Sequence, residues 1–331
     1  MNKKQVKKNV NIETTEDKTD KKSTSKENTK DIENQLKDKK LDTFKDILEF
    51  VYVFKDKEIS EMFKYISDHL KGIISKYESI NEKYLVVFLY DEGNAIDEFM
   101  VDKIYDAIPK DNKKPILMIL NSRGGRVEPS YLISKTCKEN SSNFVVVIPR
   151  RAKSAATLIS LGANEIHMGP MSELGPIDPQ IGNLPTLSIS SSLRTIAKVV
   201  TEYPDASLMF SKYLTEKLDL RILGYFERVS ESAKQYAIRL LKDKKTKRNT
   251  EEIAHDLVYE YKDHSFVIDK EEAKKYFGDM IKINTEEYSL ANDIHKFMNK
   301  LNFVVSVLRK QRIAIIGSYK DLSSSSIEKQ Q

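Results

Sequence analysis

The stretch Asn121-Ser122-Arg123-Gly124-Gly125 directly follows the apolar run Pro115–Leu120 and precedes a helical pattern over roughly Glu128–Asn140. Glycine tolerates positive φ and close backbone approach, so main-chain N–H groups in this turn can point into a cleft at the carboxyl end of the strand. Such donors hold an oxyanion or a phosphate. The stretch also fits a plain tight turn, and its spacing matches neither a Walker loop nor a GxGxxG motif.

A second turn, Pro149–Thr157, places Ser154 among small residues between the apolar run Phe144–Ile148 and a helical stretch, Ser154–Leu161. A hydroxyl at a strand-to-helix junction lies in the positive potential of the helix N-terminus, and the small neighbours leave room for a carbonyl. Taken alone, Ser154 also fits an ordinary helix N-cap.

The apolar runs around these turns predict the fold. Tyr84–Tyr90, Pro115–Leu120 and Phe144–Ile148 are short and continuous, which is typical of strands buried on both faces, and Glu165–Met168 adds a shorter strand. Alternation of strand and helix predicts parallel crossovers and an α/β fold. Both turns then meet at one sheet edge, where ligands bind in such folds. A serine with two backbone donors nearby is an acyl-transfer arrangement.

Apolar periodicity outside this core favours helices. It predicts a helix over Ile59–Tyr77, mainly helical structure over 190–262, an α/β unit over Glu271–Ile283 and a helix from Glu286. We expect four parts: a disordered Lys-rich tail (1–45), a helical lead-in (46–80), a catalytic domain (81–285) containing the helical insert 190–262, and a C-terminal helix with a polar tail (286–331).

The net charge of +5, from 55 Lys+Arg and 50 Asp+Glu in 331 residues, lies mostly in the expected tail. Residues 1–45 hold 13 Lys against 9 Asp+Glu, with Phe44 as their one aromatic residue. A segment so poor in apolar residues cannot offset its ordering entropy. The rest of the chain is nearly neutral, so we expect no specific nucleic-acid partner.

The composition also bears on compartment and cofactors. The longest apolar run, Tyr84–Tyr90, is far shorter than the ~20 residues of a membrane-spanning helix, and residues 1–40 hold no apolar stretch like a secretory signal. Cys137 is the single cysteine, which excludes an internal disulfide and favours a reducing, cytoplasmic location. No metal or cofactor is implied.

The order strand, SxGG turn, helix, strand, small-Ser-small turn, helix resembles the Clp protease/crotonase superfamily. Within it, the segments Ser154–Ile166 and Leu174–Gln180 are similar to the serine dehydrogenase proteinase family, which is related to signal peptide peptidase. The resemblance covers about Tyr84 to Ile283. It implies a Clp protease/crotonase-like repeated ββα core with a helical insert and a disordered N-terminal tail.

The resemblance implies roles for the residues of the two turns. Ser154 would be the nucleophile, and the N–H groups of Gly125 and Ala155 would form the oxyanion hole, with Gly124 shaping the turn. This sequence has Ser-Ala-Ala where many relatives have a glycine beside the serine, and both residue types are small.

The general base is less well defined by the sequence. Related peptidases use a histidine or a lysine farther along the chain, and Lys198 lies at a suitable distance in a helical stretch. A lysine serves as a base when desolvation lowers its pKa. However, Arg194, Lys198 and Glu202 at four-residue steps also fit a solvated helix face. Lys153 neighbours Ser154, but adjacent residues of a helix diverge, so a substrate contact or a surface position is favoured for it.

Two further residues are candidates to orient or replace that base. His264 lies in a segment that resembles the family's closing segment, which carries a His-Asp-type pair, although it also fits a surface histidine. Asp178 lies between Pro176 and Pro179 in a stiffened loop, where it can orient the base, line the substrate groove or simply form a turn.

These inferences together predict an ATP-independent serine peptidase that cleaves peptides or exposed protein segments through an acyl-enzyme on Ser154. Assembly in this superfamily implies a homo-oligomer, with the insert 190–262 as a candidate contact. Two alternatives stay open. One is a catalytically inactive assembly protein that keeps the fold but lacks the base. The other is a crotonase-like acyl-CoA enzyme, which shares the oxyanion hole but needs no nucleophilic serine.

Overall fold

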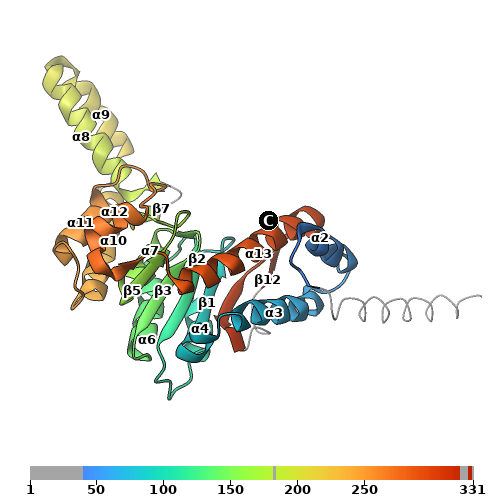
Figure 1. Cartoon of the computed structure of the whole chain (residues 1–331). Coiled ribbons are helices and arrows are strands. Elements are labelled where there is room, and N and C mark those ends of the chain that lie inside the picture. The colour runs from blue at the N-terminus through green and yellow to red at the C-terminus, as the bar shows by residue number, and fades with distance from the viewer. Residues whose placement is uncertain (1–39, 182–183, 321–326, 330–331) are drawn as a thin grey trace, which may run out of the picture.

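The computed structural model (Figure 1) describes residues 40–181, 184–320 and 327–329. Its centre is an eight-stranded sheet with the path β11-β1-β2-β3-β5-β9, in which β4 pairs with β2 and β6. Neighbours from β1 to β9 along this path run parallel, whereas β11 is antiparallel to β1. The strands are β1 (Leu85–Asp91), β2 (Ile116–Ser122), β3 (Phe144–Ile148), β4 (Arg151–Ala152), β5 (Glu165–Met168), β6 (Glu173–Leu174), β9 (Ile281–Lys282) and β11 (Ile315–Ser318).

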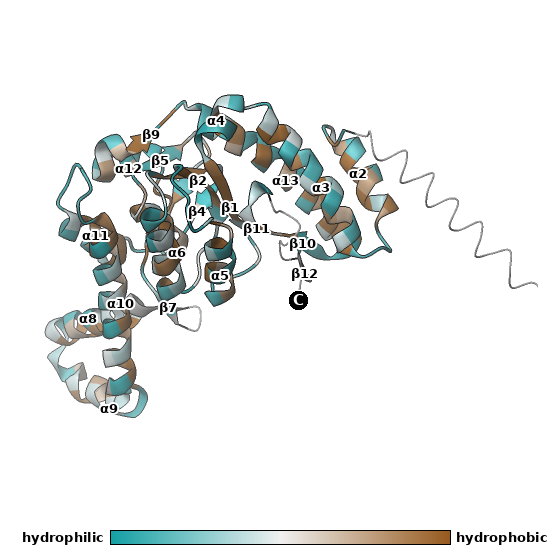
Figure 2. Cartoon of the chain, turned by 90° about the horizontal axis from the view of Figure 1, so that it is seen from below, coloured by the Kyte–Doolittle hydropathy of each residue, from teal (hydrophilic) through white to brown (hydrophobic). Residues whose placement is uncertain are grey.

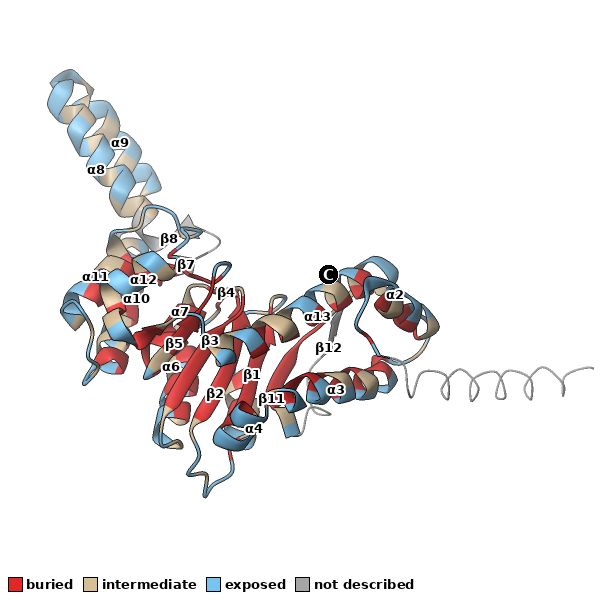
Figure 3. Cartoon of the chain, viewed as in Figure 1, coloured by how far each residue is buried: buried red, intermediate tan, exposed pale blue. Residues whose placement is uncertain are grey.

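The central strands are buried on both faces because helices cover both sides of the sheet. Every residue of β1, β2 and β3 is buried, as Figure 3 shows, and Figure 2 shows β1 as hydrophobic. Alternate residues join different cores: Val87 and Leu89 of β1 pack in one cluster, Val86 and Phe88 in the other. This is why each strand reads as a continuous apolar run rather than an alternating one.

The first face of the sheet carries the two turns predicted to hold the chemistry. Its helices contribute to one hydrophobic cluster that includes Cys137 and Phe277. They are α5 (Glu98–Asp106), α6 (Val127–Glu139), α7 (Ala155–Leu161), α10 (Leu220–Leu241), α11 (Thr250–Tyr259) and α12 (Lys270–Phe277).

The second face is covered by helices from both ends of the described chain. Their apolar residues form the other cluster, in which Phe50, Ile66 and Met298 are fully buried. These helices are α2 (Phe44–Val53), α3 (Ile59–Ser75), α4 (Glu78–Lys83) and α13 (Glu286–Arg309). Short elements complete the fold: the pair β7 (Gln180–Ile181) and β8 (Leu184–Pro185), the pair β10 (Gln311–Ile313) and β12 (Ile327–Lys329), and the 3-10 turns η1 (Pro204–Ala206) and η2 (Gly278–Met280).

A pair of helices within the predicted insert projects from this body. Figures 1 and 3 show α8 (Thr186–Glu202) and α9 (Ser207–Lys217) extending away from the sheet, and we call these two helices the arm. Every residue of α9 is exposed or half-buried. The remainder of the predicted insert differs, because α10 and α11 pack on the first face of the sheet.

The predicted α/β fold and its strands are confirmed, while the ends of the chain differ from expectation. Residues 1–39 of the expected disordered tail lie outside the described residues, but Leu41 is buried and α2 begins at Phe44. The C-terminal region was expected to hold a helix and a polar tail, yet β11 forms an edge of the main sheet. A four-residue strand gives too short an apolar run to be separated from the helix before it. Among the described residues, no helix is long and apolar enough to cross a membrane.

Candidate active site

The two predicted turns are in direct contact. Ser122 of β2 pairs with Ala152 of β4, and the Lys153 N–H donates to the Ser122 carbonyl at 3.1 Å. Gly124 has a φ of 108°, and a Cβ on it would lie 2.8 Å from the Cβ of Ser154. Gly124 is therefore required both by its backbone conformation and by the serine that lies against it.

Ser154 is held in a conformation that L-residues rarely adopt. Its φ is 51° and its ψ is −122°, at the junction of β4 and α7. It occupies the N-cap position of α7, but its side chain makes no capping hydrogen bond to the helix. The start of α7 is fixed instead by Thr157, whose hydroxyl donates to the Ala152 carbonyl at 2.6 Å and accepts from the Gly175 N–H at 3.0 Å. The geometry thus argues against the ordinary N-cap interpretation of Ser154, and strain of this kind is typical of functional sites.

Two backbone N–H groups of these turns are not used by the secondary structure around them. Gly125 forms a parallel bridge with Ile96, in which Ile96 bonds the Gly124 carbonyl and the Arg126 N–H, each at 2.9 Å. In such a bridge the N–H of the middle residue points to the opposite side, away from Ile96. The Ala155 N–H is the first of α7 and has no intrahelical acceptor. The Gly124 N–H instead donates to Ser122 Oγ at 3.2 Å. Of these three N–H groups, those of Gly125 and Ala155 have no hydrogen-bond partner among the described residues, and Gly124 shapes the turn.

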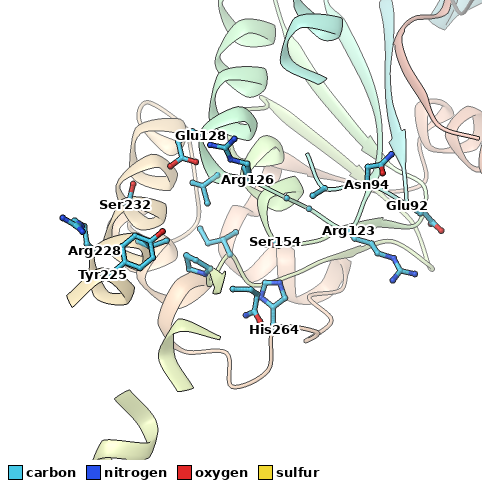
Figure 4. Close-up of a pocket in the computed structure, with 18 of the residues that line it drawn as sticks. Glu92, Asn94, Arg123, Arg126, Glu128, Ser154, Tyr225, Arg228, Ser232 and His264 are labelled. Carbon is cyan, nitrogen blue, oxygen red and sulfur yellow. The ribbon is translucent and has the colours of Figure 1, made fainter. Parts of the chain in front are cut away.

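A cavity of about 670 Å³ opens beside these groups (Figure 4). Ser154, Gly124, Gly125 and His264 all line it. Its other walls come from the loop after β1, the start of α6, the 177–180 loop and α10. The side chains that Figure 4 labels there are Glu92, Asn94, Arg123, Arg126, Glu128, Tyr225, Arg228 and Ser232.

His264 and Asp178 form a hydrogen-bonded pair at the wall of this cavity. The His264 Nδ1 lies 2.7 Å from Asp178 Oδ1, and the second carboxylate oxygen accepts from Gln180 Nε2 at 3.0 Å. Asp178 is buried, whereas His264 is half-buried and lines the cavity with Ser154. A carboxylate only accepts, so it selects the tautomer with hydrogen on Nδ1 and leaves the Nε2 lone pair free. Within the described residues, no direct hydrogen bond joins His264 to Ser154, and such contacts often tighten only when substrate binds.

Lys198 and Lys153 lie elsewhere. Lys198 is exposed on α8, in the arm, and is absent from the residues that line the Ser154 cavity. The Lys153 ammonium contacts backbone carbonyls and the carboxylate of Glu173, and its closest contact is the Phe266 carbonyl at 2.8 Å. Burial lowers the pKa of Lys153, and the carboxylate of Glu173 opposes that effect. Of the four candidates to accept or direct the proton, only His264 is among the described residues that line the Ser154 cavity, and Asp178 is its hydrogen-bond partner.

Glu173 is a buried acidic residue that sequence reasoning missed. It lies among three cations, with Arg150 at 2.9 Å, Lys153 at 3.2 Å and Arg151 at 3.9 Å. Nothing in the local pattern Ser172-Glu173-Leu174 marks it, because its partners lie on a strand-like segment about twenty residues earlier in the chain. The described residues contain no group of three or more His, Cys, Asp or Glu side chains that could hold a metal ion.

A strained serine with two backbone donors, beside an Asp–His pair, is the arrangement typical of serine hydrolases that act by acyl transfer. The sequence model of the family described as ClpP-like SDH-type serine proteinase matches residues 67–307. The chain belongs to this family.

Individual relatives are more distant. An uncharacterized protein of Methanocaldococcus jannaschii is 29% identical over 224 residues, which is 68% of this chain and 72% of that protein. A second uncharacterized protein of the same organism is 30% identical over 143 residues, 43% of this chain and 44% of its own length.

Solved structures with partial likeness carry protease names. Two are variants of the 1510-N membrane-bound stomatin-specific protease, one of them in complex with a substrate peptide. Each is 18% identical with a TM-score of 0.39 and covers 66% of this chain, and 86% or 81% of the respective solved chain. The 1510-N protease from Pyrococcus horikoshii, specific for a stomatin homolog, gives 18% identity, a TM-score of 0.34, and coverage of 66% and 79%.

Proposed function

We propose that the chain is a serine peptidase that cleaves peptides or exposed protein segments through an acyl-enzyme on Ser154. Ser154 Oγ attacks the substrate carbonyl carbon and its proton passes to His264. The N–H groups of Gly125 and Ala155 hold the oxyanion that forms. His264 then gives the proton to the leaving amine, and water hydrolyses the ester. Each lost oxyanion donor is expected to cost about 2.7–4 kcal/mol of barrier.

His264, oriented by Asp178, is the general base of this proposal in place of Lys198. The observation that carries it is the 2.7 Å contact from His264 Nδ1 to Asp178 at the wall of the cavity that Ser154 lines. It leaves Nε2 as the atom available to the serine. Lys198 would need the arm to move, because its side chain is exposed on α8.

A fluorophosphonate probe, which reacts only with activated serines, tests the nucleophile and the base together. We expect wild-type protein to be labelled and Ser154→Ala to be unlabelled. His264→Gln and Asp178→Asn should each slow labelling by about 100-fold or more, because general-base catalysis contributes roughly 10²–10⁴-fold. Lys198→Met is the matched control and should label at the wild-type rate.

Other results would decide between the alternatives. Fast labelling of His264→Gln with slow labelling of Lys198→Met would return the role of base to Lys198. No Ser154-dependent labelling would favour the inactive assembly protein. Acyl-CoA that co-purifies with the protein would favour the crotonase-like enzyme.

The remaining parts of the proposal concern the context of the activity. We expect peptide hydrolysis without added ATP, a cytoplasmic location as the single cysteine favours, and a homo-oligomer. Exposed apolar side chains on the arm support the oligomer: Leu208, Met209 and Tyr213 of α9 are each more than half exposed. Apolar side chains gathered on an unburied helix are typical of an interaction surface.

A further inference from the structure

The ammonium group of Lys153 joins three segments of the chain. Its Nζ donates to the carbonyls of Phe266 at 2.8 Å, Ser265 at 3.3 Å and Leu174 at 3.3 Å, and pairs with Glu173 at 3.2 Å. The side chain is only 14% exposed. An ammonium has three N–H donors, so these oxygens take up all of its hydrogen-bonding capacity.

Both ends of this contact lie next to residues of the proposed mechanism. Lys153 immediately precedes Ser154, and Ser265 and Phe266 immediately follow His264. The side chain therefore bridges the backbone that presents the nucleophile and the backbone that presents the base.

The segment that carries His264 has few other polar attachments in the described part of the chain, and the ring of Phe266 contacts the ring of Tyr261 with centroids 4.8 Å apart. Asp263, Ser265, Phe266 and Val267 are exposed. Among the residues that the structure describes, the backbone N–H groups of Ser265 and Phe266 bond only within the segment, to Asp263. The segment is fixed to the body at its far end, where Ile268 and Leu174 exchange two backbone hydrogen bonds. Between that point and the His264–Asp178 contact, Lys153 supplies the link to the sheet.

The surroundings hold the lysine in this position. Glu173 is buried, and its carboxylate compensates the ammonium charge. Gly175 leaves the space that the lysine chain crosses, because a Cβ there would lie 2.7 Å from Lys153 Cδ.

We propose that Lys153 is a positioning residue, which fastens the segment 263–268 to the nucleophile turn and so sets the place of His264 relative to Ser154. This inference rests on the proposed function. It assigns Lys153 no contact with substrate and no proton transfer.

The test compares Lys153→Met with wild type in the rate of fluorophosphonate labelling and in amide hydrogen exchange. We expect labelling about 10- to 100-fold slower, because misplacing a catalytic group by about 1 Å costs about that much. Exchange should become faster in segment 263–268 and stay unchanged in β1. Lys262→Met removes an exposed lysine from the same part of the chain and should change neither quantity.

A double-mutant cycle separates positioning from a merely structural role. If Lys153 acts through His264, Lys153→Met should change the residual labelling of His264→Gln by less than about twofold. An equal loss in both backgrounds, or wild-type labelling by Lys153→Met, would overturn the inference. Gly175→Ala, which keeps every charge but crowds the lysine chain, is the second variant if Lys153→Met does not fold, and it should slow labelling only where His264 is present.

Failure of the proposed function gives a different result. If wild-type protein shows no labelling that depends on Ser154 and His264, the mechanism is wrong. The amide hydrogen exchange of segment 263–268 in Lys153→Met then still decides whether the lysine fastens this segment. Unchanged exchange would show that it does not.

Discussion

Ser154 stands at φ 51° and ψ −122° because the turn from β4 to α7 must bring its side chain against Gly124. A non-glycine residue in such a region costs of order 1–3 kcal/mol, which the surrounding hydrogen bonds must compensate. Thr157 supplies two of them, as donor to the Ala152 carbonyl and as acceptor from the Gly175 N–H, and the Ala156 N–H adds a third to the Lys153 carbonyl at 2.9 Å. The Ser154 side chain makes no capping hydrogen bond and lines the cavity. Its backbone conformation therefore lowers the stability of the fold while it places the hydroxyl at the cavity.

Replacing Ser154 tests this strain separately from the chemistry. Ser154→Gly and Ser154→Ala both remove the hydroxyl, but only glycine tolerates the positive φ. We expect Ser154→Gly to have a free energy of unfolding about 1 kcal/mol higher than Ser154→Ala in urea titrations. The same pair of substitutions at Ser160, inside α7, should show the opposite order, because glycine costs about 1 kcal/mol relative to alanine in a helix. Equal stability of the two Ser154 variants would contradict the strain.

At the scale of elements, the arm differs from the helices that cover the two faces of the sheet in how little of its apolar surface is buried. Helix α3 has an apolar stripe that is buried in the second cluster, including Met62, Ile66 and Leu70. Helix α9 carries apolar residues but buries none of them in this chain. A short helix is marginal without tertiary packing, so the arm is the element whose order depends most on a partner.

Charge placed on the arm should therefore change the assembly state. We expect Leu208→Asp to convert the proposed homo-oligomer to a smaller species, because each buried leucine contributes about 1.5–3 kcal/mol to such a contact. Size-exclusion chromatography with light scattering measures the mass, and circular dichroism checks that the helices remain. Ser211→Asp, on the same helix, adds the same charge without removing an apolar group and should leave the mass unchanged. A wild-type monomer at all concentrations would exclude this contact.

The elements show how far the sequence could predict the site. The run Tyr84–Tyr90 matches β1 closely because burial on both faces leaves a continuous apolar signal. The turns at Gly124 and Ser154 were predictable because each follows such a strand. The Asp178–His264 pair was not, since the residues are 86 positions apart and lie in loops without periodicity. Helical spacing around Lys198 predicted α8 but could not show that it leaves the body of the molecule.

At the scale of the whole molecule, the expected lead-in and C-terminal helix share one hydrophobic core with the central sheet. Helices α2, α3 and α13 pack together with the outward residues of β1 and β3 in one cluster. Three histidines contact residues in or next to this cluster. The ring centroids of His69 and Phe297 lie 4.4 Å apart in a tilted arrangement. The Nδ1 of His295 lies 2.7 Å from the Tyr90 hydroxyl, and the Nδ1 of His167 lies 2.8 Å from the Thr285 hydroxyl. Burial is the main cause that lowers the pKa of each.

These lowered pKa values predict loss of stability in mild acid. The unfolded chain binds protons near the ordinary histidine pKa of 6.5, whereas the folded chain binds them only at lower pH. The unfolded state thus takes up more protons as pH falls through that range, and the free energy of unfolding decreases. Urea titrations from about pH 7.5 to about pH 5.5 should show the decrease. His69→Phe keeps a ring against Phe297 and should make the decrease smaller; an unchanged pH dependence would argue against burial as the cause.

The strand β11 brings a consequence for synthesis. Val87 of β1 pairs with Ser318, and Tyr90 pairs with Ile315, so one edge of the main sheet is formed by residues that lie more than 150 positions after Ser154 in the chain. Pairings so distant along the chain are slow to form, and until residues 315–318 leave the ribosome β1 has one open edge. We expect the sheet to stay incomplete in the nascent chain until this pairing has formed. In the proposed serine peptidase, β1 would therefore gain its second neighbour only after residues 315–318 have been made, more than 150 positions after Ser154.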